Sequence, residues 1–320
     1  MDLIYANEEN IDLGVLTDYT FDLAFGEDEN DFQLELPLMA HCIDQDYKVY
    51  IEGTEYGGIV DSITVDTNNN TVTYEGRTWH GIFNSKVITP ATGDDYYVIS
   101  GDANDIIAQI ITDYNYGDLF VAETEPSGIV LTSTNVDRYK KAYDVLLKIF
   151  RDNGGKLKFT YDGTQCKIEC VLLVDYSQDE EFDSDQLTFK IQKNYNPVNH
   201  LICLGKGELS ARQRIDLYAD ESGNISTTQS ITGLAEVVDV YDYSSVESLG
   251  ELEKEGTKHF KEIRKDGDID VNLEQTQDFD ISDKIGAVEY TTGISVVKYI
   301  SKKIVKIDSK GTTINYNING

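Results

Sequence analysis

The feature that most constrains the fold is a two-residue alternation of polar and apolar residues in the first 95 positions. Asp18–Leu23, Phe32–Leu36 and Val49–Glu52 all alternate in this way. Because successive side chains of a β-strand point to opposite faces, each run predicts a strand with one face buried. Ile59–Gly76 predicts a hairpin, since the Asn68-Asn69-Asn70 run at its centre tolerates the left-handed backbone of a turn. This part of the chain is therefore expected to be β.

Apolar residues take up helical spacing between residues 96 and 175. Ser100-Gly101-Asp102 is a suitable N-cap for a helix that carries Ile106, Ile107, Ile110 and Ile111 on one face. A second helix is predicted from Val136 to Phe150, with Tyr139 on its apolar stripe and Asn153-Gly154-Gly155 as its left-handed stop. Strands at 157–161 and 165–174 then predict a hairpin, so this stretch is expected to be a small α+β module.

From residue 176 onward the pattern returns to strands. Residues 176–185 predict an acidic linker, and a strand follows at 187–191. Val246–Arg264 has few strong apolar positions and many charges, which predicts a surface or interface helix. The chain ends in strands predicted at 294–299, 303–307 and 312–316, the last two joined by a turn at Ser309-Lys310-Gly311.

The net charge excludes several kinds of partner. The chain has 58 acidic and 27 basic residues among 320, a formal charge of −31, which repels exposed nucleic acid and anionic membrane surfaces. No apolar run is long enough to span a bilayer. We therefore expect no specific nucleic-acid binding and no membrane span, although acidic walls in a channel formed by many copies would let nucleic acid pass without sticking.

No catalytic, cofactor or metal motif is evident. The four histidines, His41, His80, His200 and His259, lack the paired spacing of a zinc site, and no nucleophile elbow is present. The four cysteines form no CxxC pair, so we expect buried free thiols, with Cys166 and Cys170 on one face of a strand; the others are Cys42 and Cys203. We predict no catalytic residues, no cofactor-binding residues and no metal ligands.

Two carboxylate clusters are candidate cation sites. Glu27-Asp28-Glu29-Asn30-Asp31 and residues 179–185 supply oxygen ligands, but neither has EF-hand spacing, so solvated acidic loops are expected rather than calcium sites. A glycosidase needs a pair of carboxylates across a cleft, and the sequence selects no such pair.

Two smaller motifs have structural interpretations. Gly205-Lys206-Gly207-Glu208 resembles half of a phosphate-binding loop but lacks the rest of it, so a tight bend is expected. Trp79-His80, beside Arg77, predicts a small aromatic plug in the end of a barrel, with ligand contact as the alternative.

Two segments resemble the siphovirus tail protein family related to baseplate hub proteins. The first is Tyr195–Leu209, followed by Arg212, Arg214 and Ile215–Tyr218. The second is Phe279–Gly286 with Gly293–Val296 and Ile300–Ile307, which is similar to the closing strands of that family. The resemblance implies rings of subunits, commonly trimers, that join a tail tube to the central spike or tip, without enzymatic activity.

Taken with this resemblance, the expected fold is mainly β with an α+β insertion. Residues 1–95 and 176–320 are expected to be β-barrel-like, tail-tube-like domains, the second with a helical insertion near 246–265. Residues 96–175 form the small α+β module between them. Many short strands and no catalytic signature suit a part of an assembly better than a pocket enzyme.

The expected function is a structural subunit of a phage or phage-derived tail, namely the baseplate hub. Its expected partners are other copies of itself in a ring, tail tube proteins and tip or spike proteins. The N-terminus lacks the features of a secretory signal, so we expect synthesis in the bacterial host cytoplasm and residence in the virion tail. The alternatives are a carbohydrate- or receptor-binding tail protein, with exposed Tyr and Trp79 as stacking platforms, and a hydrolase of cell-wall polymer.

Overall fold

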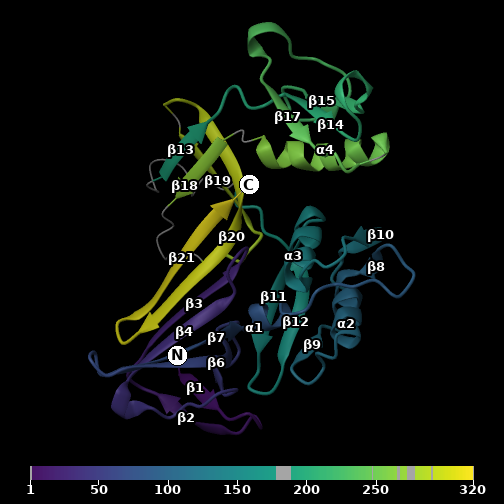
Figure 1. The fold of residues 1–320 in the computed structure, drawn as a ribbon. Coiled ribbons are helices and arrows are strands. Elements are labelled where there is room, and N and C mark those ends of the chain that lie inside the picture. Colours follow the sequence, from purple (N-terminus) through teal and green to yellow (C-terminus); the bar gives the residue numbers. More distant parts are fainter. Residues whose placement is uncertain are drawn as a thin grey trace. The chain divides into compact units, whose positions relative to one another are not determined.

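A computed structural model describes residues 2–177, 189–246, 248–264, 267–271, 278–289 and 291–319. The chain divides into two compact units (Figure 1). The first comprises Met1–Phe189, Val271–Val288 and Val297–Gly320, and the second comprises Lys190–Asp270 and Glu289–Val296. The expected division at residues 95/96 and 175/176 stays a prediction. The whole acidic run at 179–185 and the start of the strand expected at 187–191 lie outside the described residues.

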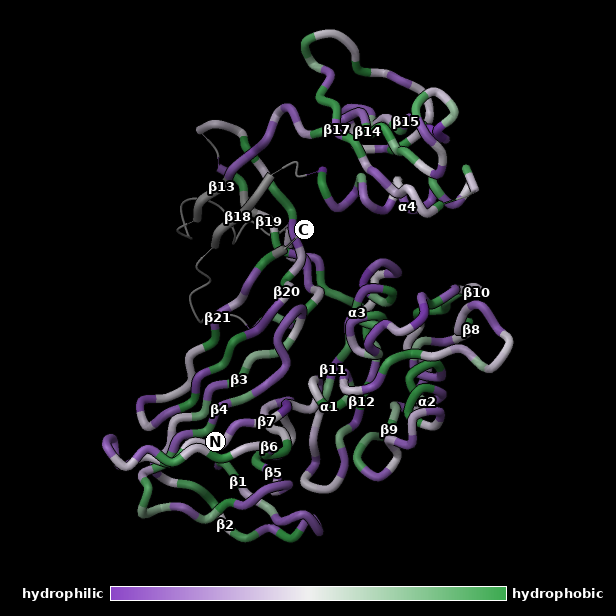
Figure 2. The backbone as a smooth tube through the Cα atoms, viewed as in Figure 1, coloured by the Kyte–Doolittle hydropathy of each residue, from purple (hydrophilic) through white to green (hydrophobic). Residues whose placement is uncertain are grey.

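A ten-stranded sheet dominates the first unit. Its order is β19-β20-β3-β4-β7-β6-β5-β1-β2, and β21 pairs with β20. The strands predicted in the first 95 residues are confirmed, and Figure 2 shows hydrophobic and hydrophilic residues alternating along them. The ten strands are β1 (Leu3–Ala6), β2 (Asp12–Leu16), β3 (Thr20–Gly26), β4 (Asp31–Pro37), β5 (Lys48–Tyr50), β6 (Gly57–Asp66), β7 (Thr71–Thr78), β19 (Lys284–Glu289), β20 (Ile294–Asp308) and β21 (Gly311–Asn319).

The end of the chain completes the sheet begun by its start. β20 runs antiparallel to β3, with Lys302 opposite Gly26 and Ile307 opposite Phe21. A Cβ atom on Gly26 would lie 2.3 Å from the Ser301 carbonyl oxygen, and the φ of Gly26 is +131°, so the strands meet closely only because this residue is glycine. The two strands predicted at 294–299 and 303–307 are one continuous strand, because Ile300 and Lys302 both pair with β21 across a register shift and Lys302 also pairs with β3.

The small α+β module lies in the sequence between β7 and the last three strands of the large sheet. Its three-stranded sheet has the order β11-β12-β9, with β12 antiparallel to β11 and parallel to β9. Helix α2 begins behind Asp102, whose side chain accepts from the Asn104 N–H as predicted. The elements are α1 (Trp79–Phe83), β8 (Tyr97–Asp102), α2 (Ala103–Asp113), β9 (Phe120–Ala122), β10 (Val130–Val136), α3 (Ala142–Asp152), β11 (Gly155–Tyr161) and β12 (Cys166–Leu172).

The predicted start of the second helix was wrong. Val136 is the last residue of β10 and pairs with Tyr97, and the helix begins only at Ala142. Tyr139, predicted on the apolar stripe, has a φ of 59° and is largely exposed, so the chain turns there before entering α3. The predicted stop is confirmed, because Gly154 has a φ of 84° directly after the helix.

One hydrophobic core joins the large sheet to the module within the first unit. Trp79 and His80, on α1, are buried in it. The Trp79 ring stacks on Tyr161 with centroids 4.4 Å apart, and the His80 ring lies parallel to Phe25 at 4.6 Å. Both residues are therefore core side chains, and Trp79 cannot stack on a ligand.

The second unit has its own core. Its four-stranded sheet has the order β16-β15-β14-β17, and the helix predicted within Val246–Arg264 is present as α4. Leu252 and Phe260 of α4 are buried with Leu201, Cys203 and Leu217 of the sheet. The elements are β13 (Phe189–Lys193), β14 (His200–Leu204), β15 (Arg214–Ala219), β16 (Ile225–Ser226), β17 (Val238–Asp242), α4 (Leu249–Ile263) and β18 (Gly267–Val271), with 3₁₀ turns η1 (Leu38–Ala40) in the first unit and η3 (Leu209–Ala211) and η4 (Gly233–Ala235) here.

The prediction of a mainly β fold with a small α+β insertion is thus confirmed. Across the described ranges no sheet closes into a barrel, because the ten-stranded sheet runs from β19 to β2 without joining its ends. Within those same ranges no helix is long and apolar enough to cross a membrane.

Candidate functional site

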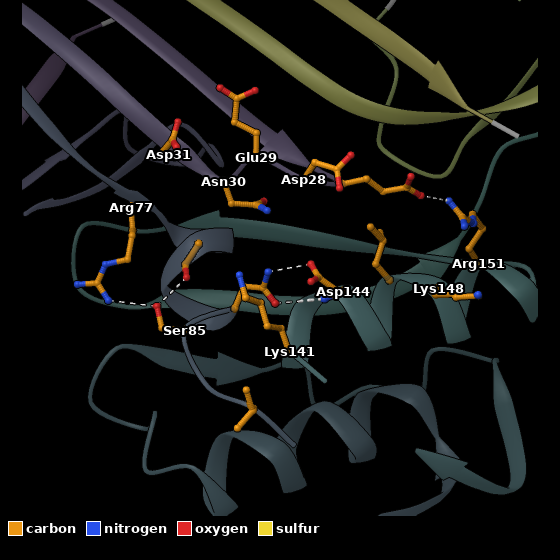
Figure 3. A pocket seen from close by; sticks show the side chains of 15 residues that line it. Asp28, Glu29, Asn30, Asp31, Arg77, Ser85, Lys141, Asp144, Lys148 and Arg151 are labelled. Carbon is orange, nitrogen blue, oxygen red and sulfur yellow. Dashed lines mark hydrogen bonds and ion pairs between the residues drawn. The ribbon is translucent and has the colours of Figure 1, made fainter. Parts of the chain in front are cut away.

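A charged groove in the first unit has a volume of about 960 Å³. We call it the charged groove; it lies between the β3–β4 loop at Glu27–Asp31, the end of α1, and α3 (Figure 3). Acidic side chains project from the loop, and basic side chains project from the region of α3. The lining residues are Glu27, Asp28, Glu29, Asn30, Asp31, Arg77, Gly81, Asn84, Ser85, Val87, Lys141, Asp144, Leu147, Lys148 and Arg151.

The acidic wall has a defined shape. The Asn30 side chain closes the β3–β4 loop, because its Oδ1 accepts from the Gly26 N–H at 3.0 Å and its Nδ2 donates to the Gly26 carbonyl at 2.9 Å. Asp28 has a φ of 72°, a left-handed conformation that Asp tolerates in turns. Partial burial, with the nearby charge of Glu29, raises the pKa of Asp31. A positively charged group placed beside Asp31 would therefore stabilise its ionised carboxylate.

This acidic cluster does not gather into a cation site. Glu27 pairs with Arg151 at 2.6 Å, and Glu29 pairs with Lys302 at 2.6 Å, so two carboxylates turn toward protein cations. Searched over the described parts of the chain, no three His, Cys, Asp or Glu residues lie close enough to hold a metal. The second cluster, residues 179–185, lies outside those parts.

The basic wall is held by hydrogen bonds from several elements. Arg77 donates to both oxygens of Asp61, at 2.8 and 2.6 Å, and to Ser85 Oγ at 3.1 Å. Buried Asn84 fixes the start of α3, since its Oδ1 accepts from the Tyr143 and Asp144 N–H groups and its Nδ2 donates to Asp144. The groove is therefore a firm surface that carries charges of both signs, suited to a protein segment that also carries both signs.

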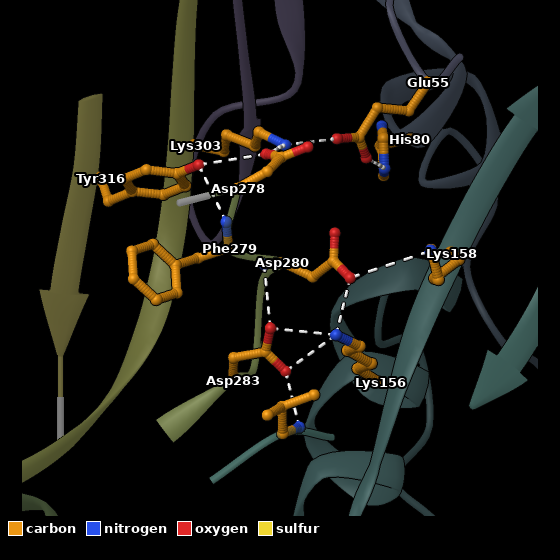
Figure 4. A network of polar contacts seen from close by, with 11 residues as sticks. Glu55, His80, Lys156, Lys158, Asp278, Phe279, Asp280, Asp283, Lys303 and Tyr316 are labelled. Atoms are coloured by element: carbon orange, nitrogen blue, oxygen red, sulfur yellow. Dashed lines mark hydrogen bonds and ion pairs between the residues drawn. The ribbon is translucent and has the colours of Figure 1, made fainter. Parts of the chain in front are cut away.

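A buried ionic network holds the segment Asp278–Asp283 in the first unit (Figure 4). Lys156 of β11 donates to both oxygens of Asp283 at 2.9 Å and lies 2.6 Å from Asp280. Asp283 also accepts from the N–H groups of Val174 and Asp280. Burial lowers the pKa of Lys156, but the hydrogen bonds to Asp280 and Asp283 raise it more, so the net shift is upward and the ammonium stays charged.

The same segment is held from the other side by Lys303 of β20. Its ammonium pairs with Glu55 at 3.0 Å and with Asp278 at 2.9 Å, and Tyr316 of β21 donates to Asp278. Burial lowers the pKa of His80 to about 3, and the charge of Lys303 adds to this effect, so His80 is neutral at physiological pH. The network ties the module, the large sheet and the last strands together within this unit.

The remaining histidines all have protein partners. His41 Nδ1 lies 2.6 Å from the Tyr74 hydroxyl, and the His259 ring stacks on Tyr241. His200 lies between Asp216 and Glu236, 2.7 Å from each, and stacks on Tyr218. None of these histidines lies in the charged groove.

Three of the four cysteines are buried as expected. Burial raises the pKa of Cys170 to about 12 and that of Cys203 to about 11, which makes both thiols poor nucleophiles. Cys166 and Cys170 are both buried from β12, so the predicted shared face is confirmed. The prediction was wrong for Cys42, which is exposed because it follows the surface turn η1.

The bend expected at Gly205–Glu208 is present. Gly207 has a φ of 119°, and the chain returns so that Gly205 N–H donates to the Gln213 carbonyl. Sequence reasoning missed Lys156 and Lys303, the centres of the ionic network. A signal was available for Lys303, which shares its strand face with the apolar residues Val305 and Ile307, but not for Lys156, whose neighbour on the same face is Lys158.

The fold is similar to that of solved tail proteins, although no sequence comparison finds a match. No family model and no curated protein sequence matches this chain. Three solved structures resemble it over 100% of its length: the 43 kDa tail protein of prophage MuSo2 from Shewanella oneidensis, the prophage tail protein gp18 from Listeria monocytogenes and a tail protein from Neisseria meningitidis. Their TM-scores are 0.58, 0.56 and 0.53, at 11%, 13% and 12% identity, and the chain covers 98%, 95% and 96% of theirs. The chain thus has the fold of these prophage tail proteins, and the resemblance found in its sequence is confirmed at that level.

Proposed function

We propose that this chain is a structural subunit of a phage or phage-derived tail, and that it is the baseplate hub joining the tail tube to the tip or spike. The observation that carries the proposal is the correspondence of fold with three prophage tail proteins, over nearly the whole length of each. A match of both units supports a common architecture, whereas a match of one would support only a shared domain. In this proposal the chain resides in the virion tail, is made in the host cytoplasm and has no catalytic role.

The proposed hub forms a ring of copies, with a trimer as the expected state. The end strand β2 of the large sheet supports this, because Ile11, Leu13 and Val15 at that edge are exposed. An apolar sheet edge is prone to pair with other chains unless an assembly covers it. Pairing between copies would also complete barrel-like domains that the single chain leaves open.

The charged groove is the proposed contact with a neighbouring tail protein or another copy. Charges of both signs at fixed positions in the groove favour one alignment of a charged partner, since a shifted partner would bring like charges together. The charge of −31 supports a further role: carboxylates that face a central channel would keep nucleic acid from adhering as it passes.

Deletion of the gene from its phage or prophage, with complementation from a plasmid, tests the proposal. A hub is required for assembly, so the deletion should yield particles without complete tails in electron micrographs, and complementation should restore them. Complete tails that fail to adsorb would favour the receptor-binding alternative. Normal, infectious particles would refute a structural role.

The hydrolase alternative has a separate test. Purified protein should leave peptidoglycan intact in a zymogram, because a structural subunit needs no hydrolytic site and the groove carboxylates Glu27 and Glu29 are paired with protein cations. Clearing of the gel by the wild-type chain would refute the non-enzymatic proposal.

A further inference from the structure

A second cavity, of about 410 Å³, lies in the second unit within the segment that resembles tail proteins. We call it the Tyr195 pocket. Its walls come from the chain after β13, from the turn at Glu221 and Ser222, from the loop at Ile231 and from Arg264 after α4. All of these residues belong to the second unit, so the pocket is complete within it.

Tyr195 is an exposed aromatic ring on this pocket. Its residue surface is 72% exposed, although aromatic side chains are normally among those that contribute most to cores. The Lys193 ammonium lies 5.6 Å from the ring centroid, a cation–π contact that limits the orientation of the ring. A flat, oriented and solvent-exposed ring beside a cavity is a platform on which a ligand can stack.

Hydrogen bonds preorganise two walls of the pocket. Asn199 is buried, and its side chain donates to the Ala235 carbonyl at 2.7 Å and accepts from the Val237 N–H at 3.0 Å, which fixes the loop on one side. Asp220 accepts from the Ser222 and Asn224 N–H groups, which fixes the turn that carries Glu221. A ligand therefore meets walls that are already ordered, which lowers the entropy cost of binding.

The chemistry of the lining indicates the class of ligand. Asn194, Asn196 and Ser222 offer both donors and acceptors. Glu221 adds one negative charge, and Lys193 and Arg264 add two positive ones, of which Lys193 lies against the Tyr195 ring. Such a lining matches a molecule that carries many hydroxyl or amide groups and little charge. A polyanion is disfavoured by the charge of −31, and a purely apolar ligand would cover polar side chains without forming hydrogen bonds to them.

We propose that the Tyr195 pocket binds a neutral saccharide. One face of the sugar ring packs its C–H groups on Tyr195, and the hydroxyl groups bond to the asparagine amides and Ser222. This inference does not rest on the hub proposal, because the two can fail separately. A hub could lack a saccharide site, and a saccharide-binding protein need not belong to a tail.

The test uses the full chain and four forms of it. Wild type, Tyr195→Phe, Tyr195→Ala and Tyr139→Ala are applied to an array of neutral oligosaccharides, and the strongest saccharide is titrated by calorimetry. Tyr139 is a matched control, because it is 64% exposed, belongs to the first unit and is not among the residues that line the pocket. Circular dichroism of each form establishes that it is folded.

We expect binding of at least one neutral saccharide, a loss of tenfold or more in affinity for Tyr195→Ala, and less than threefold change for Tyr195→Phe and Tyr139→Ala. The phenylalanine variant keeps the stacking ring, so it separates stacking from loss of the hydroxyl. Absence of binding by folded wild type at 10 mM or about that concentration of saccharide would overturn the inference. Binding that survives Tyr195→Ala, or binding of acidic saccharides alone, would also overturn it.

Discussion

Asp283 provides the sharpest test of what holds the first unit together. Its side chain is 1% exposed and its partner Lys156 is 6% exposed, so both charges of the pair are buried. Asp283→Ala removes the acceptor of four hydrogen bonds, two from the Lys156 ammonium and one each from the Val174 and Asp280 N–H groups. Removing one partner of a buried ion pair costs about 3–5 kcal/mol. Since whole domains are stable by about 5–15 kcal/mol, the free energy of unfolding should fall by a large fraction.

Urea unfolding followed by tryptophan fluorescence measures this change. Trp79 is the only tryptophan and is fully buried in the first unit, so its emission reports the unfolding of that unit. Asp61→Ala is the control, because the Asp61–Arg77 pair is exposed at 36% and 45% and should contribute about 0–1 kcal/mol. An Asp283→Ala variant within about 1 kcal/mol of wild type, or a control that costs as much, would refute the reasoning.

Three further predictions follow from the interior. The pKa of His80 is lowered to about 3, so between about pH 3 and 6.5 the unfolded chain binds the extra proton and stability falls as pH drops. His80→Phe keeps a ring stacked on Phe25 but cannot bind the proton. It should reduce the slope of the unfolding free energy against pH by up to about 1.4 kcal/mol per pH unit between about pH 4 and 6. An unchanged slope would contradict this prediction. Gly76→Ala would place a Cβ atom 2.0 Å from the Ile59 carbonyl oxygen and should lower the free energy of unfolding, measured in urea, by about 1–3 kcal/mol. Gly117→Ala, where the added Cβ meets no atom within 4 Å, should change it little. Equal effects would count against the close contact between β6 and β7. Ellman's reagent should modify one thiol per native chain, at Cys42, and the other three only in urea, so fast native labelling of two or more would show that the buried thiols are misplaced.

Much of the local structure could be predicted from the sequence because it depends on local patterns. The strands β3 and β4 follow from two-residue alternation, and α2 follows from its cap and its isoleucine spacing. The start of α3 could not be found in this way, because Val136 suits a helical stripe and a strand equally well. Pairing with β8 decided between them, and such pairing depends on residues far apart in the sequence.

The sites were less accessible to sequence reasoning. The run Glu27–Asp31 was noticed for its carboxylates, but the groove it lines also needs Arg77 and Arg151, which only the folded chain brings near. The ionic network likewise joins Lys156, Asp283 and Lys303 from separate strands and loops. Spacing in one sequence does not reveal which distant charges meet, although an inward-facing lysine on an alternating strand is a sign that a partner exists.

The central claim, that this chain is a hub subunit of a tail, is tested most directly by its position in purified particles. Cryo-electron microscopy of the particles should show the ten-stranded sheet and the α+β module in density at the end of the tail tube, repeated in a ring around the tail axis. Mass spectrometry of the same particles should detect the chain in a constant ratio to the tube protein. Particles that contain no such density and no peptides of this chain would contradict the account.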